Sequence, residues 1–203
     1  MFRKVIDLGA NPGSVKKFFL DNKKVVLAVC AAVVLIGATV IAINVREQRL
    51  QEAQEKAYTT GASAYSEGKF DKAITELEKA KELAPGDAKT HLNLAQSYEA
   101  KGELDKALAE YKASIEADPK QPEALYNIAI IYKSKADIAN AIKSLEAAVK
   151  LNKEFVAARI ALGDLYVING ENAKAKGEYE AVVNMNPYGV DLEEIKQKIK
   201  VLK

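Results

Sequence analysis

The feature that most constrains this chain is a set of residue columns that recur every 34 residues. Small residues, turn-forming residues and prolines each keep this spacing. The small column is Ala73, Ala107, Ala141 and Ala175, and the turn column is Gly68, Gly102, Ala136 and Gly170. The closing column is Pro85, Pro119, Lys153 and Pro187. Two further columns are Gly61, Ala95, Ala129, Gly163 and Tyr98, Tyr132, Tyr166. Chance does not align five columns at one spacing, so the chain is built from copies of one unit.

Each copy contains two apolar runs at helical spacing, one on each side of the turn residue. In the second copy they are Leu94, Ala95 and Tyr98, then Leu104, Ala107, Leu108 and Tyr111. This pattern predicts two amphipathic helices joined by a tight turn. Gly102 can adopt the turn conformation without a side-chain penalty, and the small residues let the paired helices approach closely. Because one hairpin cannot bury its own apolar face, successive hairpins are expected to stack.

The order of small, aromatic, glycine, alanine and proline positions in a 34-residue period resembles the tetratricopeptide repeat. The resemblance covers residues 54–189, as repeats 54–87, 88–121, 122–155 and 156–189. It implies an all-α, right-handed superhelix of four helix-turn-helix repeats. Residues 190–203 place Leu192, Ile195, Ile199 and Leu202 on one face, which predicts a capping helix. Since Ala136 replaces glycine and Lys153 replaces proline, we expect the third turn and the third junction to differ from the others.

Residues 25–45 carry no charge and are long enough to cross a bilayer, so we predict one transmembrane helix before the repeats. Two processing alternatives stay open. A cleaved signal peptide usually has a shorter apolar stretch. A lipoprotein signal would modify Cys30, but the apolar run continues well past that cysteine. Residues 46–56 are strong helix formers, so we expect a helical stalk that joins the membrane helix to the first repeat.

Basic residues are concentrated before the apolar run. They are Arg3, Lys4, Lys16, Lys17, Lys23 and Lys24, against Arg46, Arg49 and Lys56 on the other side. This asymmetry predicts a cytoplasmic N-terminus in an inner membrane, with the repeats in the periplasm or outside the cell. Residues 1–24 are expected to form a basic tail or a short interfacial helix capped by Ser14, with Phe18, Phe19 and Leu20 at the membrane surface.

The sequence offers no candidate for catalysis. It has no glycine-rich phosphate loop and no nucleophile beside a base, and its single cysteine and single histidine cannot form a Cys/His metal cluster. We therefore expect no enzyme activity, no cofactor and no metal. The total charge of +2 hides an asymmetry, because residues 46–203 hold 24 basic and 26 acidic side chains. A nearly neutral, slightly acidic repeat region gives no electrostatic case for nucleic-acid binding. His91 lies in a bulky column of the second repeat and is expected to be a packing residue.

The resemblance implies that partner proteins bind the concave face, which is lined by the first helix of each repeat. The groove positions carried over from the family are Tyr58, Tyr65, Leu92, Asn93, Gln96, Tyr126, Asn127, Ile130, Ile160 and Asp164. Asn93 and Asn127 lie one period apart, and a ladder of amides can hold a peptide backbone. Some family members clamp a C-terminal carboxylate with Lys and Arg in the first helices. Here those positions hold Glu123 and Ala157 or Ala161, which does not favour that mode.

The whole layout is similar to the translocon-associated repeat proteins of bacterial inner membranes. It is also similar to the anchored repeat proteins of cytochrome c maturation and to a mitochondrial import receptor. We therefore predict a membrane-anchored module that docks partner proteins or peptides and acts in assembly or as a chaperone for exported or membrane proteins. The alternative is a fixed accessory or scaffold subunit of a larger membrane complex. Ala28 and Ala32, like Ala38 and Ala42, would permit close packing of the membrane helix against a membrane partner.

Overall fold

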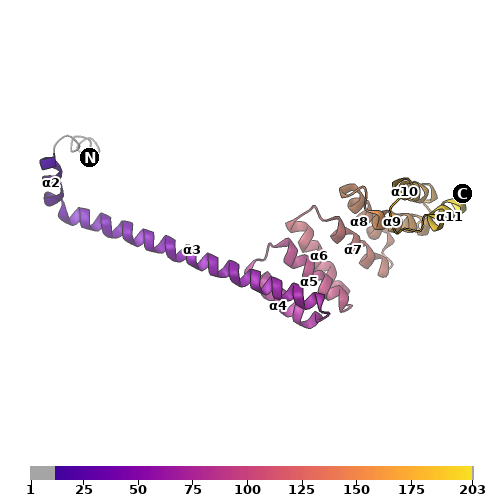
Figure 1. Ribbon diagram of the computed structural model, residues 1–203, viewed down its shortest axis with the longest axis horizontal. Coiled ribbons are helices and arrows are strands. Elements are labelled where there is room, and N and C mark those ends of the chain that lie inside the picture. Colours follow the sequence, from indigo (N-terminus) through magenta and orange to yellow (C-terminus); the bar gives the residue numbers. More distant parts are fainter. Residues whose placement is uncertain (1–11, 203) are drawn as a thin grey trace. The chain divides into compact units, whose positions relative to one another are not determined.

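The computed structural model describes residues 12–202, and the regular structure of this part of the chain is entirely helical (Figure 1). The first two helices are α2 (Pro12–Asp21) and α3 (Lys23–Ser66). The others are α4 (Phe70–Leu83), α5 (Ala88–Ala100), α6 (Leu104–Ala117), α7 (Pro122–Ser134), α8 (Ile138–Leu151), α9 (Val156–Ile168), α10 (Asn172–Met185) and α11 (Leu192–Val201). The chain divides into two compact units, an N-terminal segment of residues 1–52 and a repeat domain of residues 53–203.

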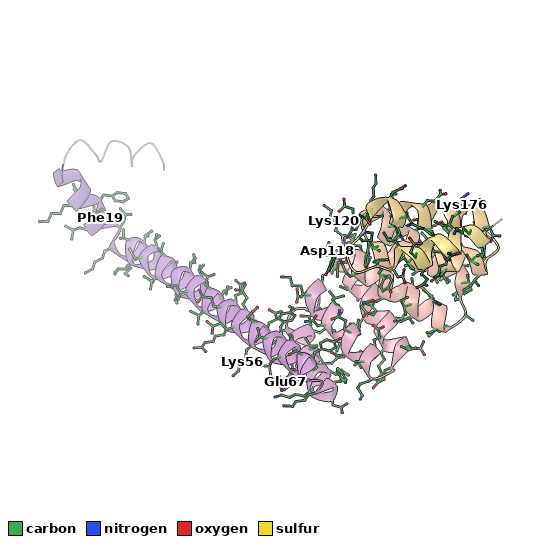
Figure 2. All side chains as sticks on the ribbon, turned by 45° about the vertical axis from the view of Figure 1, so that its right-hand side comes forward. Phe19, Lys56, Glu67, Asp118, Lys120 and Lys176 are labelled. Carbon is green, nitrogen blue, oxygen red and sulfur yellow. The ribbon has the colours of Figure 1, made fainter. Side chains whose placement is uncertain are left out.

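In the N-terminal segment, α2 begins at Pro12, two residues before Ser14. The prediction that Ser14 caps this helix is therefore wrong. Proline suits the first position of a helix because its missing N–H has no intrahelical acceptor there. The rings of Phe18 and Phe19 meet edge to face, with 6.1 Å between centroids, and Phe19 extends from the helix into the surroundings (Figure 2). The other part of the predicted basic tail, residues 1–11, lies outside the described residues.

Helix α3 contains the apolar run of residues 25–45 and also residues 46–56. Among residues 12–202 it is the one helix that is long and apolar enough to cross a membrane, and its most apolar stretch is not buried within the protein.

The repeat domain is a stack of helix pairs. Helix α5 packs on α6, α7 on α8 and α9 on α10, and successive pairs meet through α4 and α5, α6 and α7, and α8 and α9 (Figure 1). In the first pair the last turns of α3 pack on α4, where Gly61 lies directly against Leu77. The final helix, α11, packs on α10 and buries Ile195 against the core. The predicted solenoid of helix hairpins with a terminal helix is confirmed.

The small-residue column explains why the paired helices can lie so close together. Its four members, Ala73, Ala107, Ala141 and Ala175, are all completely buried. A larger side chain at any of them would have to displace a neighbouring helix, because protein interiors are close-packed. The column therefore sets the distance between the two helices of each pair.

The four turns share one backbone geometry, including the turn at Ala136. The φ angles are 73°, 76°, 57° and 79° at Gly68, Gly102, Ala136 and Gly170. In each turn this residue donates its N–H to the carbonyl three residues earlier, and the next residue donates to the carbonyl five residues earlier. The expectation that the third turn differs is therefore wrong. This hydrogen-bond pattern requires the left-handed conformation, and alanine adopts it at an energetic cost.

The junctions between repeats also differ from expectation. Asp118 and Asn152 end their helices in an extended conformation, and Ala84 has a φ of −139° and a ψ of 78°. Asn186, in contrast, ends α10 in the left-handed conformation. The third junction matches the second even though Lys153 replaces proline. In the second junction the side chain of Asp118 accepts a 3.0 Å hydrogen bond from the backbone N–H of Lys120, and Figure 2 labels both residues. In the third junction the side chain of Asn152 accepts a 3.0 Å hydrogen bond from the backbone N–H of Glu154. The fourth junction, not the third, is the distinct one.

Candidate docking face on the first helices

One residue at the same position of each first helix forms a column on the repeat domain. This first-helix column consists of Tyr58 on α3, Leu92 on α5, Tyr126 on α7 and Ile160 on α9. All four are half-buried, so each is anchored in the core by part of its side chain and offers the rest to solvent. The other predicted groove residues, Tyr65, Asn93, Gln96, Asn127, Ile130 and Asp164, are half-buried as well.

Ring contacts hold two of the aromatic members of this face, Tyr126 and Tyr65. Tyr126 packs against Phe155, the residue before α9, with 5.4 Å between ring centroids. Tyr65 packs against Phe70 at the start of α4, with 5.7 Å between centroids. Each tyrosine is thus held by a residue from the following helix or repeat. A surface held in this way loses little side-chain entropy when a partner binds.

The two asparagines of the predicted ladder have different surroundings. Asn127 Nδ2 donates a 3.0 Å hydrogen bond to the Tyr111 hydroxyl, which itself donates 2.6 Å to Glu99. Burial raises the pKa of Tyr111 far above its usual range, and Glu99 raises it further. Asn93 makes no side-chain hydrogen bond within residues 12–202. Asn127 is therefore part of the internal packing between α6 and α7, whereas the amide of Asn93 is available to a ligand.

Asp164 is also engaged, because it links α9 to α10 and to the terminal helix. It accepts 2.6 Å from the Tyr179 hydroxyl and 2.8 Å from Lys198 Nζ, and this lysine also lies over the Tyr179 ring. The Asp164 carboxylate raises the pKa of Lys198. This residue therefore has a structural role in addition to any contact with a partner.

His91 is buried, as predicted, but it is a polar junction and not a plain packing residue. Its Nδ1 lies 2.6 Å from Glu110 Oε2 and its Nε2 lies 2.9 Å from the Pro85 carbonyl oxygen. Lys81 completes the cluster with a 3.0 Å ion pair to Glu110.

The same arrangement recurs two repeats later, at Arg159. The guanidinium bonds to Glu178 at 2.5 Å and to the Lys153 carbonyl at 2.7 Å. Tyrosines follow the same alternation, since Tyr98 donates to Glu78 at 2.9 Å and Tyr166 to Glu146 at 2.6 Å. The bonded pairs therefore recur every 68 residues, that is, in every second repeat. This longer spacing is present in the sequence, but comparing single residues at 34-residue intervals does not reveal it.

Other kinds of site were sought in the described part of the chain. Among residues 12–202 no group of three or more His, Cys, Asp or Glu side chains is placed to hold a metal ion. Cys30 lies in the N-terminal segment and His91 in the repeat domain, and His91 is bonded to Glu110.

Comparisons with known proteins agree with the helix-pair architecture. Tetratricopeptide repeat models match residues 64–133 and residues 122–155. No curated protein sequence matches this chain. A crystal structure of MamA is similar, with 26% identity and a TM-score of 0.68, and the match covers 75% of this chain and 81% of MamA.

Two further solved structures share the fold. YrrB, described as a TPR protein with an unusual peptide-binding site, has 18% identity and a TM-score of 0.65, with 75% of this chain and 81% of YrrB covered. PilF of Pseudomonas aeruginosa has 22% identity and a TM-score of 0.61, with 75% of this chain and 68% of PilF covered. The matched repeats, the helix pairs and the shared turns lead to one conclusion. The repeat domain of this chain is a tetratricopeptide-repeat solenoid.

Proposed function

We propose that this protein is a membrane-anchored interaction module that docks extended segments of partner proteins on its first-helix face. The observation that carries the proposal is the first-helix column of Tyr58, Leu92, Tyr126 and Ile160. It provides one half-exposed apolar contact per repeat at a constant sequence interval. An extended peptide presents side chains at regular intervals as well, so such a column suits a segment with several apolar residues.

The polar environment of the column supports a peptide as the ligand. The amide of Asn93 can donate to a backbone carbonyl and accept from a backbone N–H. Tyrosine gives a large contact area and loses few rotatable bonds on binding. YrrB, which has this fold, is described as binding a peptide, although it is only 18% identical and supports the fold alone.

The anchor and its orientation belong to the same proposal. The uncharged residues 25–45 within α3 would cross the membrane, with the basic N-terminal flank in the cytoplasm and the repeats in the periplasm or outside. In this position the repeats would meet proteins as they are exported or assembled. A chaperone or assembly role would follow from that location.

A second candidate function is that of a fixed subunit of a membrane complex. It is favoured by the exposed Ala28/Ala32 and Ala38/Ala42 pairs of α3, because small residues four apart allow a second membrane helix to pack closely. The two functions differ in stoichiometry. A chaperone exchanges many clients weakly, whereas a subunit co-purifies with one constant set of proteins.

A photocrosslinking experiment tests the docking face. A benzoylphenylalanine side chain would replace Tyr58 or Tyr126 in the full chain, and Tyr188, which is fully exposed outside the column, would be the matched control. After irradiation in the native host, crosslinked proteins would be identified by mass spectrometry. We expect adducts from the two column positions that the control does not give. Equal adducts from all three positions would contradict the proposed face.

The orientation is tested by adding protease to spheroplasts. We expect the repeats to be digested and the N-terminal flank to be protected. Repeats that become sensitive only after lysis would reverse the topology, without bearing on the docking face.

A further inference from the structure

The second helices of the repeat domain form a separate surface, and its three equivalent positions are not filled in the same way. Each position lies between two successive second helices and over the first helix that separates them. In the second repeat it holds the hydrogen-bonded pair of His91 and Glu110, and in the fourth repeat it holds the ion pair of Arg159 and Glu178. In the third repeat the corresponding residues are Leu125 and Ser144, which form no such pair.

Because Leu125 and Ser144 replace the bonded pair of the other repeats, a groove stays open in the third repeat. We name it the third-repeat groove. It has a volume of about 380 Å³ between α6, α7 and α8. Its floor is apolar and includes Ile115, Leu125 and Ile128, while Lys112, Tyr132 and Lys143 lie around it. The equivalent space in the fourth repeat is lined by Glu146, Arg159 and Glu178 and is therefore charged.

The tyrosine of this groove lacks the carboxylate that its counterparts have. Tyr98 and Tyr166 donate their hydroxyls to Glu78 and Glu146 of the preceding second helix. The residue in that place for Tyr132 is Lys112, whose Nζ lies over the Tyr132 ring, 5.6 Å from the centroid. Within residues 12–202 the Tyr132 hydroxyl has no hydrogen-bond partner, although the side chain is only half exposed.

The charged side chains around the groove also favour an acidic ligand. Neither Lys112 nor Lys143 has a carboxylate within 4.0 Å in the described part of the chain, and both are exposed. Glu116 also lines the groove, so the three charged residues sum to one positive charge. The polar groups of Ser144 and Asn140 are already bonded to Asn140 and Asp137. The free donors are therefore a tyrosine hydroxyl and two ammonium groups.

We propose that the third-repeat groove is a second docking site, which binds a partner-protein segment with an aspartate or glutamate beside a large apolar side chain. The apolar side chain covers Ile115, Leu125 and Ile128. The carboxylate takes the place that Glu78 and Glu146 hold in the other repeats, accepting from Tyr132 and pairing with Lys112. The residues of α7 that line this groove are not those of the first-helix column. The two proposed binding sites can therefore be tested independently of each other.

The full chain in a mild detergent, with isoleucine and leucine methyl groups labelled for NMR, provides the test. The probe is the blocked peptide acetyl-Gly-Leu-Glu-Gly-amide, compared with peptides that carry Gln for Glu or Ala for Leu. We expect the first peptide to shift the methyl signals of Ile115, Leu125 and Ile128, and each changed peptide to bind about tenfold more weakly. Equal binding of the Glu and Gln peptides would contradict the proposed recognition of a carboxylate. Methyl signals that do not shift would contradict binding in the third-repeat groove.

Two variants use the other repeats as templates. Lys112→Glu should supply the missing carboxylate from within, bond to Tyr132 and abolish peptide binding, and it should not lower the thermal midpoint. Lys72→Glu on α4 makes the same charge change away from the groove and should leave binding unchanged. The double change Leu125→Arg with Ser144→Glu should fill the groove with an ion pair and also abolish binding. Retained binding in either groove variant would overturn the proposal.

A second copy of this chain could also occupy the groove, and dilution distinguishes this case. Methyl signals of Ile115 and Ile128 that shift with protein concentration in the absence of peptide would show that the chain binds itself. That result would overturn a partner protein as the occupant. Signals independent of concentration, with the expected peptide shifts, would support it.

Discussion

Gly163 on α9 lies against the ring of Tyr179 on α10 so closely that a side chain does not fit between them. A Cβ built on Gly163 would be 2.5 Å from Tyr179 Cε1 and 2.9 Å from Cζ. The ring has no room to move, because it is 1% exposed and its hydroxyl is bonded to Asp164. The glycine is therefore required by packing.

Gly163→Ala should lower the free energy of unfolding by about 1–2 kcal/mol. Overpacking costs about 1–3 kcal/mol, which exceeds the roughly 0.5–1 kcal/mol that alanine gains over glycine inside a helix. Gly177→Ala is the matched control, since no atom lies within 4 Å of its Cβ, and it should stabilise the protein. Thermal unfolding followed by circular dichroism separates the two. Equal thermal midpoints for the two variants would show that the Tyr179 ring can move to make room for the added methyl group.

Ala136→Gly should stabilise the protein by about 0.5–1 kcal/mol. Ala136 is held at a φ of 57°, and an L-residue pays about 1–2 kcal/mol for this conformation, which is larger than the entropy that glycine gains in the unfolded chain. The residue is exposed, so its methyl group contributes little packing. Gly102→Ala is the reverse change in the preceding repeat and should destabilise by a similar amount. A lower midpoint for Ala136→Gly would refute the strain.

His91→Arg should be tolerated better than His91→Leu, because Arg159 makes the same two kinds of contact in the fourth repeat. Loss of the imidazole removes the contacts to Glu110 Oε2 and to the Pro85 carbonyl and should cost about 1–3 kcal/mol, while Lys81 still pairs with Glu110 Oε1. Chemical denaturation of the full chain in detergent measures both variants. The double change His91→Leu with Glu110→Ser reproduces the pairing of Leu125 and Ser144 and should recover part of the loss. No recovery would mean that packing, not the bonds, makes His91 important.

Alkaline titration should show that four of the nine tyrosines in the chain ionise at unusually high pH. Two causes raise a tyrosine pKa well above the usual value of about 10: burial, which is the larger, and a hydrogen-bonded carboxylate. Both act on Tyr98, Tyr111, Tyr166 and Tyr179. A folded-state pKa above the unfolded one means that the stabilisation is complete below about pH 10 and is lost as pH rises through the folded value.

Absorbance at 295 nm together with circular dichroism tests this expectation. Four tyrosines should ionise only as the helices unfold, and Tyr111→Phe or Tyr179→Phe should remove one of them. Ionisation of these four tyrosines near pH 10 with the helices intact would contradict the expectation.

The helix pairs could be predicted from the sequence because each copy repeats the same apolar spacing. The turn at Ala136 could not, since its conformation is set by backbone hydrogen bonds to Lys133 and Tyr132 and not by the side chain. The bond between Asn127 and Tyr111 was also out of reach, because these residues meet only when α6 packs on α7. Residue columns show which positions are equivalent, but they do not show which neighbours share a hydrogen bond.

The alternation of bonded partners has a consequence for how such a chain can change in length. Removing residues 88–155 would join α4 to α9, so that Glu78 would stand opposite Tyr166 in the relationship that Glu146 has now. Removing residues 122–155 alone would set Lys112 opposite Tyr166 and leave its hydroxyl without an acceptor. Removal of residues 88–155 therefore keeps an acceptor for the Tyr166 hydroxyl, whereas removal of residues 122–155 alone does not. Helices of the same geometry can thus replace one another in the stack and still differ in the hydrogen bonds that they offer to a new neighbour.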